Sequence, residues 1–159
     1  MRALLALLLG STVAVGCSSV TAVGPERTLL IEFDHLPSSA DTKAVSRRGA
    51  QVTLVIQVVR GVVVRTPAEA ESFKDMGGVV SVKDLGLEED PVVSVFIHML
   101  ATPTEADVAL VTQAGGVGAS GDPSRLLITT HMRMSALDGL LTLAHVGDIN
   151  VYPNTLYLA

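Results

Sequence analysis

The chain has 159 residues, of which 48% are hydrophobic and 17% are charged, and its formal net charge is −5. Aromatic residues make up only 3% and Trp is absent, so side chains on which bases or sugar rings could stack are scarce. Lys and Arg form no cluster beyond Arg47 and Arg48. A nucleic-acid partner is therefore not expected, because binding of that kind needs basic patches and stacking platforms.

The first residues have the order of a bacterial export signal. Arg2 precedes an apolar run over residues 3–9, and small residues follow as far as Gly16. The apolar run is shorter than the roughly 20 residues that a membrane-spanning helix needs, which disfavours a retained membrane anchor of that type. We expect a signal peptide over residues 1–16.

Residues 14–17, Ala-Val-Gly-Cys, resemble a bacterial lipobox, although Leu is usual where Ala14 stands. We expect lipidation of Cys17, where two acyl chains would suffice for stable anchoring. Ordinary cleavage near Gly16, which would leave a soluble secreted protein, is the alternative. Cys17 is the only cysteine, so no disulfide can form within the chain.

Residues 17–27 are expected to be the lipidated cysteine and a short tether. Ser18 and Ser19 follow the cysteine, and no Asp is present there to resemble an inner-membrane retention signal. The N-terminus therefore predicts an exported protein that is lipid-anchored in the cell envelope, with the outer membrane favoured.

The rest of the chain repeats the order β-α-β-β-α-β, once in residues 28–86 and again in residues 91–152. In the first unit, periodicity and turn residues predict helices over 39–48, capped by Ser39, and over 68–76. Strands are predicted over 28–34, 51–59, 62–65 and 79–82.

In the second unit a helix is expected from Glu105 to Gln113, and another is expected between a Ser135 cap and a Gly147 stop. Strands are predicted over 93–97, 126–132 and 149–151, with a second strand reduced to 117–120. The fold class predicted is α+β, with two tandem ferredoxin-like units whose antiparallel sheets carry helices on one face. One continuous α+β domain without duplication is the alternative.

The first unit resembles the subtilisin propeptide and proteinase B inhibitor family. The matching series is a long β run from Gly49, a strand before Pro-Ala-Glu-Ala at residues 67–70, and Gly-Val-Val-Ser-Val at residues 78–82. The resemblance covers the second unit more weakly. It implies small ferredoxin-like domains that lay the open face of the sheet on a subtilisin-like serine protease and pass a C-terminal tail through its active-site cleft. With no protease domain in this chain, it implies a stand-alone inhibitor.

Residues 153–159 form the tail that this resemblance would place in the cleft. Pro153 favours an extended chain, and the apolar side chains that could occupy pockets are Leu156, Tyr157, Leu158 and Ala159. The alternative is structural: the same residues would add an edge strand or cover the core.

Residues 51–59 carry apolar side chains on both alternating faces, with Val52, Leu54, Ile56 and Val58 on one and Val55 and Val59 on the other. A sheet with helices on one face and water on the other alternates more cleanly. The second face must therefore be covered, either by a bound protease or by the other repeat, packed sheet against sheet or as a continuous sheet. We favour the other repeat, because permanent exposure of such a patch invites aggregation.

The sequence predicts no catalytic or metal site. The histidines, His35, His98, His131 and His145, lack the short spacings of a zinc site. Residues 115–121 are Gly-rich but lack the Lys of a phosphate loop, and the acidic run at 88–90 is explained by a solvated linker. We therefore expect no enzyme, no cofactor and no small-molecule substrate.

The leading prediction is an envelope lipoprotein that binds a subtilisin-like serine protease, with inhibition as the accompanying hypothesis. The alternative is a structural or assembly lipoprotein whose repeats bind another envelope protein.

Overall fold

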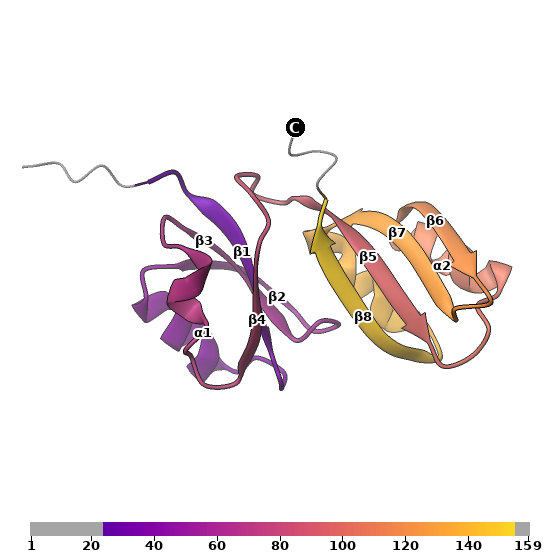
Figure 1. The fold of residues 1–159 in the computed structure, drawn as a ribbon, viewed down its shortest axis with the longest axis horizontal. Helices are drawn as coiled ribbons and strands as arrows, with labels where there is room; N and C mark the ends of the chain where they lie inside the picture. The colour runs from indigo at the N-terminus through magenta and orange to yellow at the C-terminus, as the bar shows by residue number, and fades with distance from the viewer. Residues whose placement is uncertain (1–23, 155–159) are drawn as a thin grey trace, which may run out of the picture.

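The computed structural model describes residues 24–154, and within them the chain is α+β with two four-stranded antiparallel sheets (Figure 1). The first sheet has the order β2-β3-β1-β4, and its strands are β1 (Arg27–Phe33), β2 (Gln51–Ile56), β3 (Gly61–Thr66) and β4 (Val79–Asp84). The second has the equivalent order β6-β7-β5-β8, and its strands are β5 (Val92–Met99), β6 (Val117–Asp122), β7 (Leu127–Arg133) and β8 (Val146–Pro153). The predicted antiparallel α+β class is confirmed.

The first helix of each unit begins with the same cap. In α1 (Ser39–Arg47) the Ser38 hydroxyl accepts from the Asp41 amide, and the Asp41 carboxylate accepts from the Ser38 amide. In α2 (Glu105–Gln113) Thr104 and Asp107 do the same. This reciprocal arrangement satisfies backbone donors that a helix start leaves unpaired. The cap lies at Ser38, so the prediction of Ser39 was wrong by one residue.

The second helix of each unit is a 3-10 helix, which differs from the prediction. η1 (Ala70–Phe73) occupies only part of the predicted 68–76. η2 (Met134–Thr142) begins before Ser135, which is therefore not its cap, and Gly147 lies inside β8 rather than ending a helix. The chain at η2 buries every third residue, which suits the three residues per turn of a 3-10 helix; these residues are Met134, Leu137, Leu140 and Leu143.

Two strand predictions also need correction. The run predicted over 51–59 ends as a strand at Ile56, and residues 57–60 turn the chain into β3. Arg60 has a left-handed backbone there, with φ of 50°. In the second unit, β6 extends to Asp122 instead of ending at residue 120, with a register shift between Val117 and Ser120 where it pairs with β7. As predicted, it is an edge strand, where such irregularity is tolerated.

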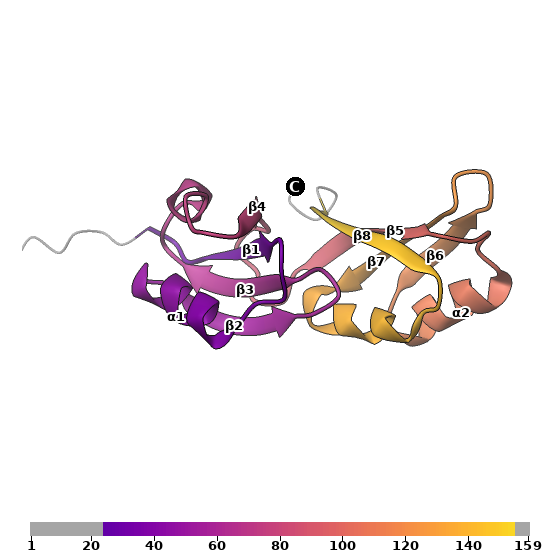
Figure 2. The same cartoon turned by 90° about the horizontal axis from the view of Figure 1, so that it is seen from below.

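Two apolar cores hold the molecule together. The first lies between the inner face of the first sheet and the helices α1 and η1, and includes Leu29, Ile31, Phe33, Val45 and Phe73. The second contains the inner face of the second sheet and η2, and it also takes in Leu30, Ile56 and Val63 from the outer face of the first sheet. The second unit therefore covers the first sheet (Figure 2).

The other repeat covers Leu54, Ile56 and Val59, which pack in the core that contains η2, whereas Val55 is exposed. The predicted division into two faces was therefore wrong, because a register shift between Val52 and Leu54 puts these two residues in different cores. The form of the cover differs from the prediction, because neither a second sheet nor a continuous sheet provides it. The covering element is η2, whose Asp138 carboxylate accepts from the backbone amides of Gln57 at 2.8 Å and Val58 at 3.0 Å. A carboxylate that accepts two backbone donors fixes the β2–β3 turn against the second unit.

The segment between the units is also held in place. Arg65 donates to the carbonyl oxygens of Leu87 at 2.7 Å and Glu88 at 3.3 Å. The Asp90 carboxylate accepts from the amide and the hydroxyl of Ser135 at 3.0 and 2.7 Å. The acidic run at 88–90, which the sequence suggested as a solvated linker, is thus bonded to both units.

Candidate functional site

The outer face of the second sheet is the candidate site. Along β5, Val93, Val95 and Ile97 point into the core and are fully buried. Successive strand residues point to opposite faces, so the residues between them, Ser94, Phe96 and His98, lie on the outer face. Figure 1 looks onto this face, and Figure 2 shows α2 and η2 on the opposite side of the sheet.

Register places neighbouring strands in rows across this outer face. Ser94 is opposite His131 on β7 and Tyr152 on β8. Phe96 is opposite Thr129 and Asn150 in the same way. His98 is opposite Leu127 and Asp148. The face therefore combines hydroxyl, amide and imidazole groups with two aromatic rings and a carboxylate, and aromatic rings are enriched at protein-binding surfaces.

The aromatic rings lie at the β8 side of the outer face. Phe96 and Tyr152 pack edge to face, with centroids 5.5 Å apart and planes at 90°. Tyr152 is 49% exposed, and with Ser94, Phe96 and His98 it lines a shallow hollow of about 430 Å³. From the first unit, Lys83 Nζ lies 5.3 Å from the Tyr152 ring centroid, a cation–π distance.

His131 connects this face to the end of β8. The Asn154 side-chain amide donates to His131 Nδ1 at 3.3 Å, and Ser94 Oγ lies 3.2 Å from the same nitrogen. Asn154 is only 6% exposed, so the chain leaves β8 from a fixed point at the margin of the outer face.

The first sheet has no equivalent free face. Leu30, Val63 and Leu85 are at most 4% exposed and belong to the core that contains η2. Where this face meets the second unit, Lys83 pairs with Glu32 at 2.9 Å, and both side chains are mostly buried. The two units therefore have related architecture but unequal surfaces.

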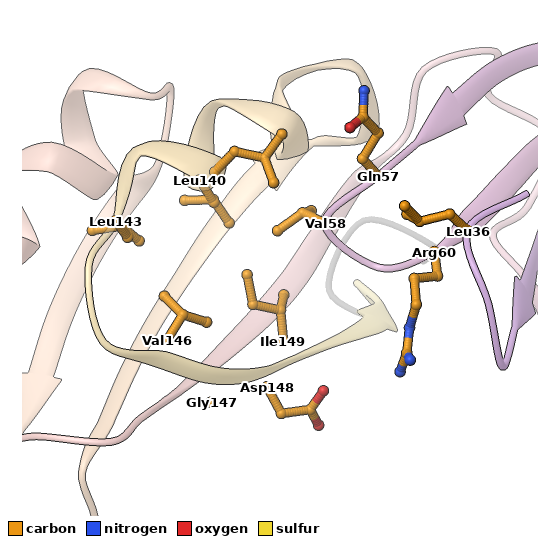
Figure 3. Close-up of a pocket in the computed structure, with 11 residues that line it drawn as sticks. Leu36, Gln57, Val58, Arg60, Leu140, Leu143, Val146, Gly147, Asp148 and Ile149 are labelled. Atoms are coloured by element: carbon orange, nitrogen blue, oxygen red, sulfur yellow. The ribbon is translucent and has the colours of Figure 1, made fainter.

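A second concave surface lies at the junction of the units. It has a volume of about 460 Å³ (Figure 3). The β2–β3 turn contributes Val58 and Arg60, while Leu140 and Leu143 come from η2 and the residue after it. The start of β8 forms the remaining wall with Val146, Gly147, Asp148 and Ile149.

His35, whose pKa is shifted, lies beside this junction, next to the lining residue Leu36. His35 Nδ1 is 2.5 Å from an Asp34 carboxylate oxygen, and Nε2 is 3.2 Å from Asp41. Both hydrogen bonds raise the pKa of His35, and the bond to Asp34 has the larger effect. Hydrogen bonds from Ser38 lower the pKa of Asp41, and the bond from its hydroxyl has a larger effect than the bond from its backbone amide. The His35 ring between two carboxylates holds the β1–α1 loop together, and both of its nitrogens are engaged by Asp34 and Asp41.

The predicted site residues are only partly placed. Cys17 and the tail residues Leu156, Tyr157, Leu158 and Ala159 lie outside the described residues. Of the four histidines, His98 and His131 lie on the outer face of the second sheet, while His35 and His145 lie in loops. Among residues 24–154, no three His, Cys, Asp or Glu side chains come together as metal ligands.

Sequence reasoning named no residue of the outer face of the second sheet, although the resemblance implies that an open sheet face contacts the protease. Its signal was present, since Ser94, Phe96 and His98 alternate with buried apolar residues along one strand. Tyr152 lies beside Phe96 because of the register in which β8 pairs with β5. That register cannot be deduced from the amino-acid sequence alone.

Comparison of the chain with known proteins identified no relative. No protein-family model, no curated protein and no solved structure matches the chain. No helix within residues 24–154 is long and apolar enough to cross a bilayer.

Proposed function

We propose that the chain is a non-enzymatic envelope lipoprotein of two ferredoxin-like units that binds and inhibits a subtilisin-like serine protease. The observation that carries the proposal is the contrast between the two sheets. The outer face of the first is buried, while the outer face of the second carries exposed Tyr152 beside Phe96. One face is thus left for a partner.

The strand order supports the ferredoxin-like part of the proposal. Both sheets have the order 2-3-1-4 with antiparallel neighbours, which is what a β-α-β-β-α-β chain gives when each helix crosses one face. The second crossover in each unit is a 3-10 helix, which departs from the usual pattern.

The position of Asn154 supports the protease-binding part. Asn154, the last described residue, is held against His131 at the margin of the outer face that would contact the protease. In the proposal, Leu156, Tyr157, Leu158 and Ala159 add main-chain hydrogen bonds and side chains to the cleft.

Inhibition of a panel of subtilisin-like proteases by the purified chain tests this function. We expect a Thr155 stop variant, which ends at Asn154, to lose inhibition while its melting temperature stays unchanged. Ending the chain there keeps the buried Asn154, which a cut after Val151 would remove. A large loss of stability with intact inhibition would instead favour a structural tail and the assembly lipoprotein.

The lipid anchor is tested separately by Cys17→Ser. The substituted chain is expected in the soluble envelope fraction, with a circular dichroism spectrum like that of wild type. If the Cys17→Ser protein still sediments with membranes, the proposal of a lipid anchor at Cys17 is wrong. The protease proposal does not depend on that result.

A further inference from the structure

The first unit reaches the margin of the outer face of the second sheet through β4. β4 and β8 are the outermost strands of their sheets, and β4 passes beside the end of β8 (Figure 1). Lys83 of β4 lies opposite Leu30 of β1, and Leu30 belongs to the core shared with the second unit. Residues directly opposite each other on neighbouring strands share a face of the sheet, so Lys83 points toward the second unit.

Glu32 holds the Lys83 side chain in place. Glu32 is opposite Ser81, two residues before Lys83 on β4, so the Glu32 and Lys83 side chains are diagonal neighbours on one face. Lys83 Nζ lies 2.9 Å from Glu32 Oε1, and the two side chains are only 20% and 13% exposed. The carboxylate therefore both neutralises the ammonium group and fixes its position.

The Tyr152 ring is held from two directions. The Lys83 ammonium lies over the ring, 5.3 Å from its centroid, and Phe96 packs against the ring edge to face at 5.5 Å. A cation is attracted to the negative face of an aromatic ring, and the attraction is stronger where the cation is partly removed from water. Tyr152 is nevertheless 49% exposed. Side chains of both units thus fix the ring while about half of the residue stays available for contact.

We infer that Lys83 is a positioning residue of the protease-binding face: from the first unit, it holds the Tyr152 ring in the orientation that the partner meets. This inference rests on the proposed function. A side chain that is already ordered loses less conformational entropy when the partner binds, so its preorganisation adds to affinity. Lys83 acts through the orientation of Tyr152 and not as a charge offered to the partner, since Glu32 neutralises it.

The mobility of the ring can be measured without a protease. The chain has two tyrosines and no Trp, so Tyr157→Phe leaves Tyr152 as the only tyrosine that emits. Time-resolved fluorescence anisotropy should then show the Tyr152 ring rotating with the whole protein. Adding Lys83→Met should introduce a fast local rotation of the ring. Adding Lys83→Arg, which keeps a cation over the ring, should not.

Inhibition is measured with the same Lys83 substitutions in a chain that keeps Tyr157. Lys83→Met should raise the inhibition constant by about three- to tenfold, the size of the ordering cost of one side chain, and Lys83→Arg should inhibit like wild type. Lys83→Met leaves the Glu32 carboxylate without its partner, so a double variant, Glu32→Gln with Lys83→Met, removes both charges and should show the same weakening. The control is Lys74→Met, which removes the cation of an exposed pair with Glu71 and should inhibit like wild type.

Weaker inhibition by Lys83→Met while the Tyr152 ring stays fixed, or a mobile ring with unchanged inhibition, would overturn the inference. Restored inhibition in the double variant would also overturn it, because the unpaired Glu32 would then be the cause. Equal weakening in Lys74→Met or in Lys83→Arg would do the same. If wild type inhibits no protease, the proposed function fails, and the anisotropy of Lys83→Met still decides separately whether Lys83 holds the ring.

Discussion

Single side chains fix the loops that join the regular elements. His35 lies between the carboxylates of Asp34 and Asp41, and Arg60 holds the Asp34 carbonyl from the next loop. Position 78 favours glycine for two reasons: its φ is +78°, and a Cβ there would lie 2.6 Å from the His35 ring. The β1–α1 loop is therefore an arrangement of a few polar contacts.

The His35 contacts predict a pH dependence of stability. The pKa of His35 is raised in the folded chain, so its protonated form stabilises the fold. That contribution is fully present below the unfolded value of about 6.5 and is lost as the pH rises through the folded pKa. Melting temperatures of wild type and His35→Gln should differ at pH 5.5 and converge by pH 8.5. A difference that grows with pH would contradict this.

Asp138 makes a direct polar contact between the two units. Removing its carboxylate leaves the Gln57 and Val58 amides without their acceptor, so Asp138→Ala should cost about 1.5–3 kcal/mol in the free energy of unfolding. Asp138→Asn keeps an acceptor oxygen and should cost less. Urea denaturation measures both, and equal costs would show that the acceptor is unimportant.

At the scale of elements, η2 is the part of the chain that serves both units. It closes the second core with one set of side chains and covers the first sheet at the same time. Its buried residues recur every three positions and its length is nine residues, longer than most 3-10 helices. Tertiary packing on both sides therefore maintains a conformation that local hydrogen bonding alone supports poorly.

Two leucines in η2 test this description. Leu137 is fully buried, so Leu137→Ala should destabilise the protein by about 2–5 kcal/mol through lost contacts and the cavity left behind. Leu141→Ala removes the same atoms from a side chain that is more than half exposed, and it should change stability by no more than about 0.5 kcal/mol. Similar costs at the two positions would contradict the packing described.

The sequence predicted these elements unevenly, for physical reasons. Capping residues and the glycines after helices are local, so α1 and α2 were predicted within about one residue. The conformation of η2 depends on contacts with the other unit, although the spacing of Met134, Leu137 and Leu140 carried a three-residue period. β2 stops at Ile56 because Val58 and Val59 turn toward the second unit, which a β-branched run does not reveal.

At the scale of the whole molecule, the shared core joins the units into one body. Leu30, Ile56 and Val63 of the first sheet belong to the same cluster as the core of the second unit. The candidate site could be predicted only in part, since the repeat suggests two open faces, and the docking of one unit on the other decides which remains free.

The shared core predicts cooperative unfolding. Separation of the units would expose the outer face of the first sheet, so neither should melt alone. Differential scanning calorimetry should give one transition whose calorimetric and van't Hoff enthalpies agree. Two resolved transitions would show that the units are stable independently.

The central claim concerns the outer face of the second sheet, and one measurement addresses it directly. Titration of subtilisin-like proteases with wild type and with Tyr152→Asp, which puts a charge on that face, should show inhibition of at least one protease by wild type. The variant should inhibit at least about tenfold more weakly, a loss of roughly 1.4 kcal/mol. The control, Leu141→Asp, alters an exposed leucine away from that face and should inhibit like wild type. No binding of wild type to any protease at micromolar concentration, or equal inhibition by Tyr152→Asp, would contradict the account.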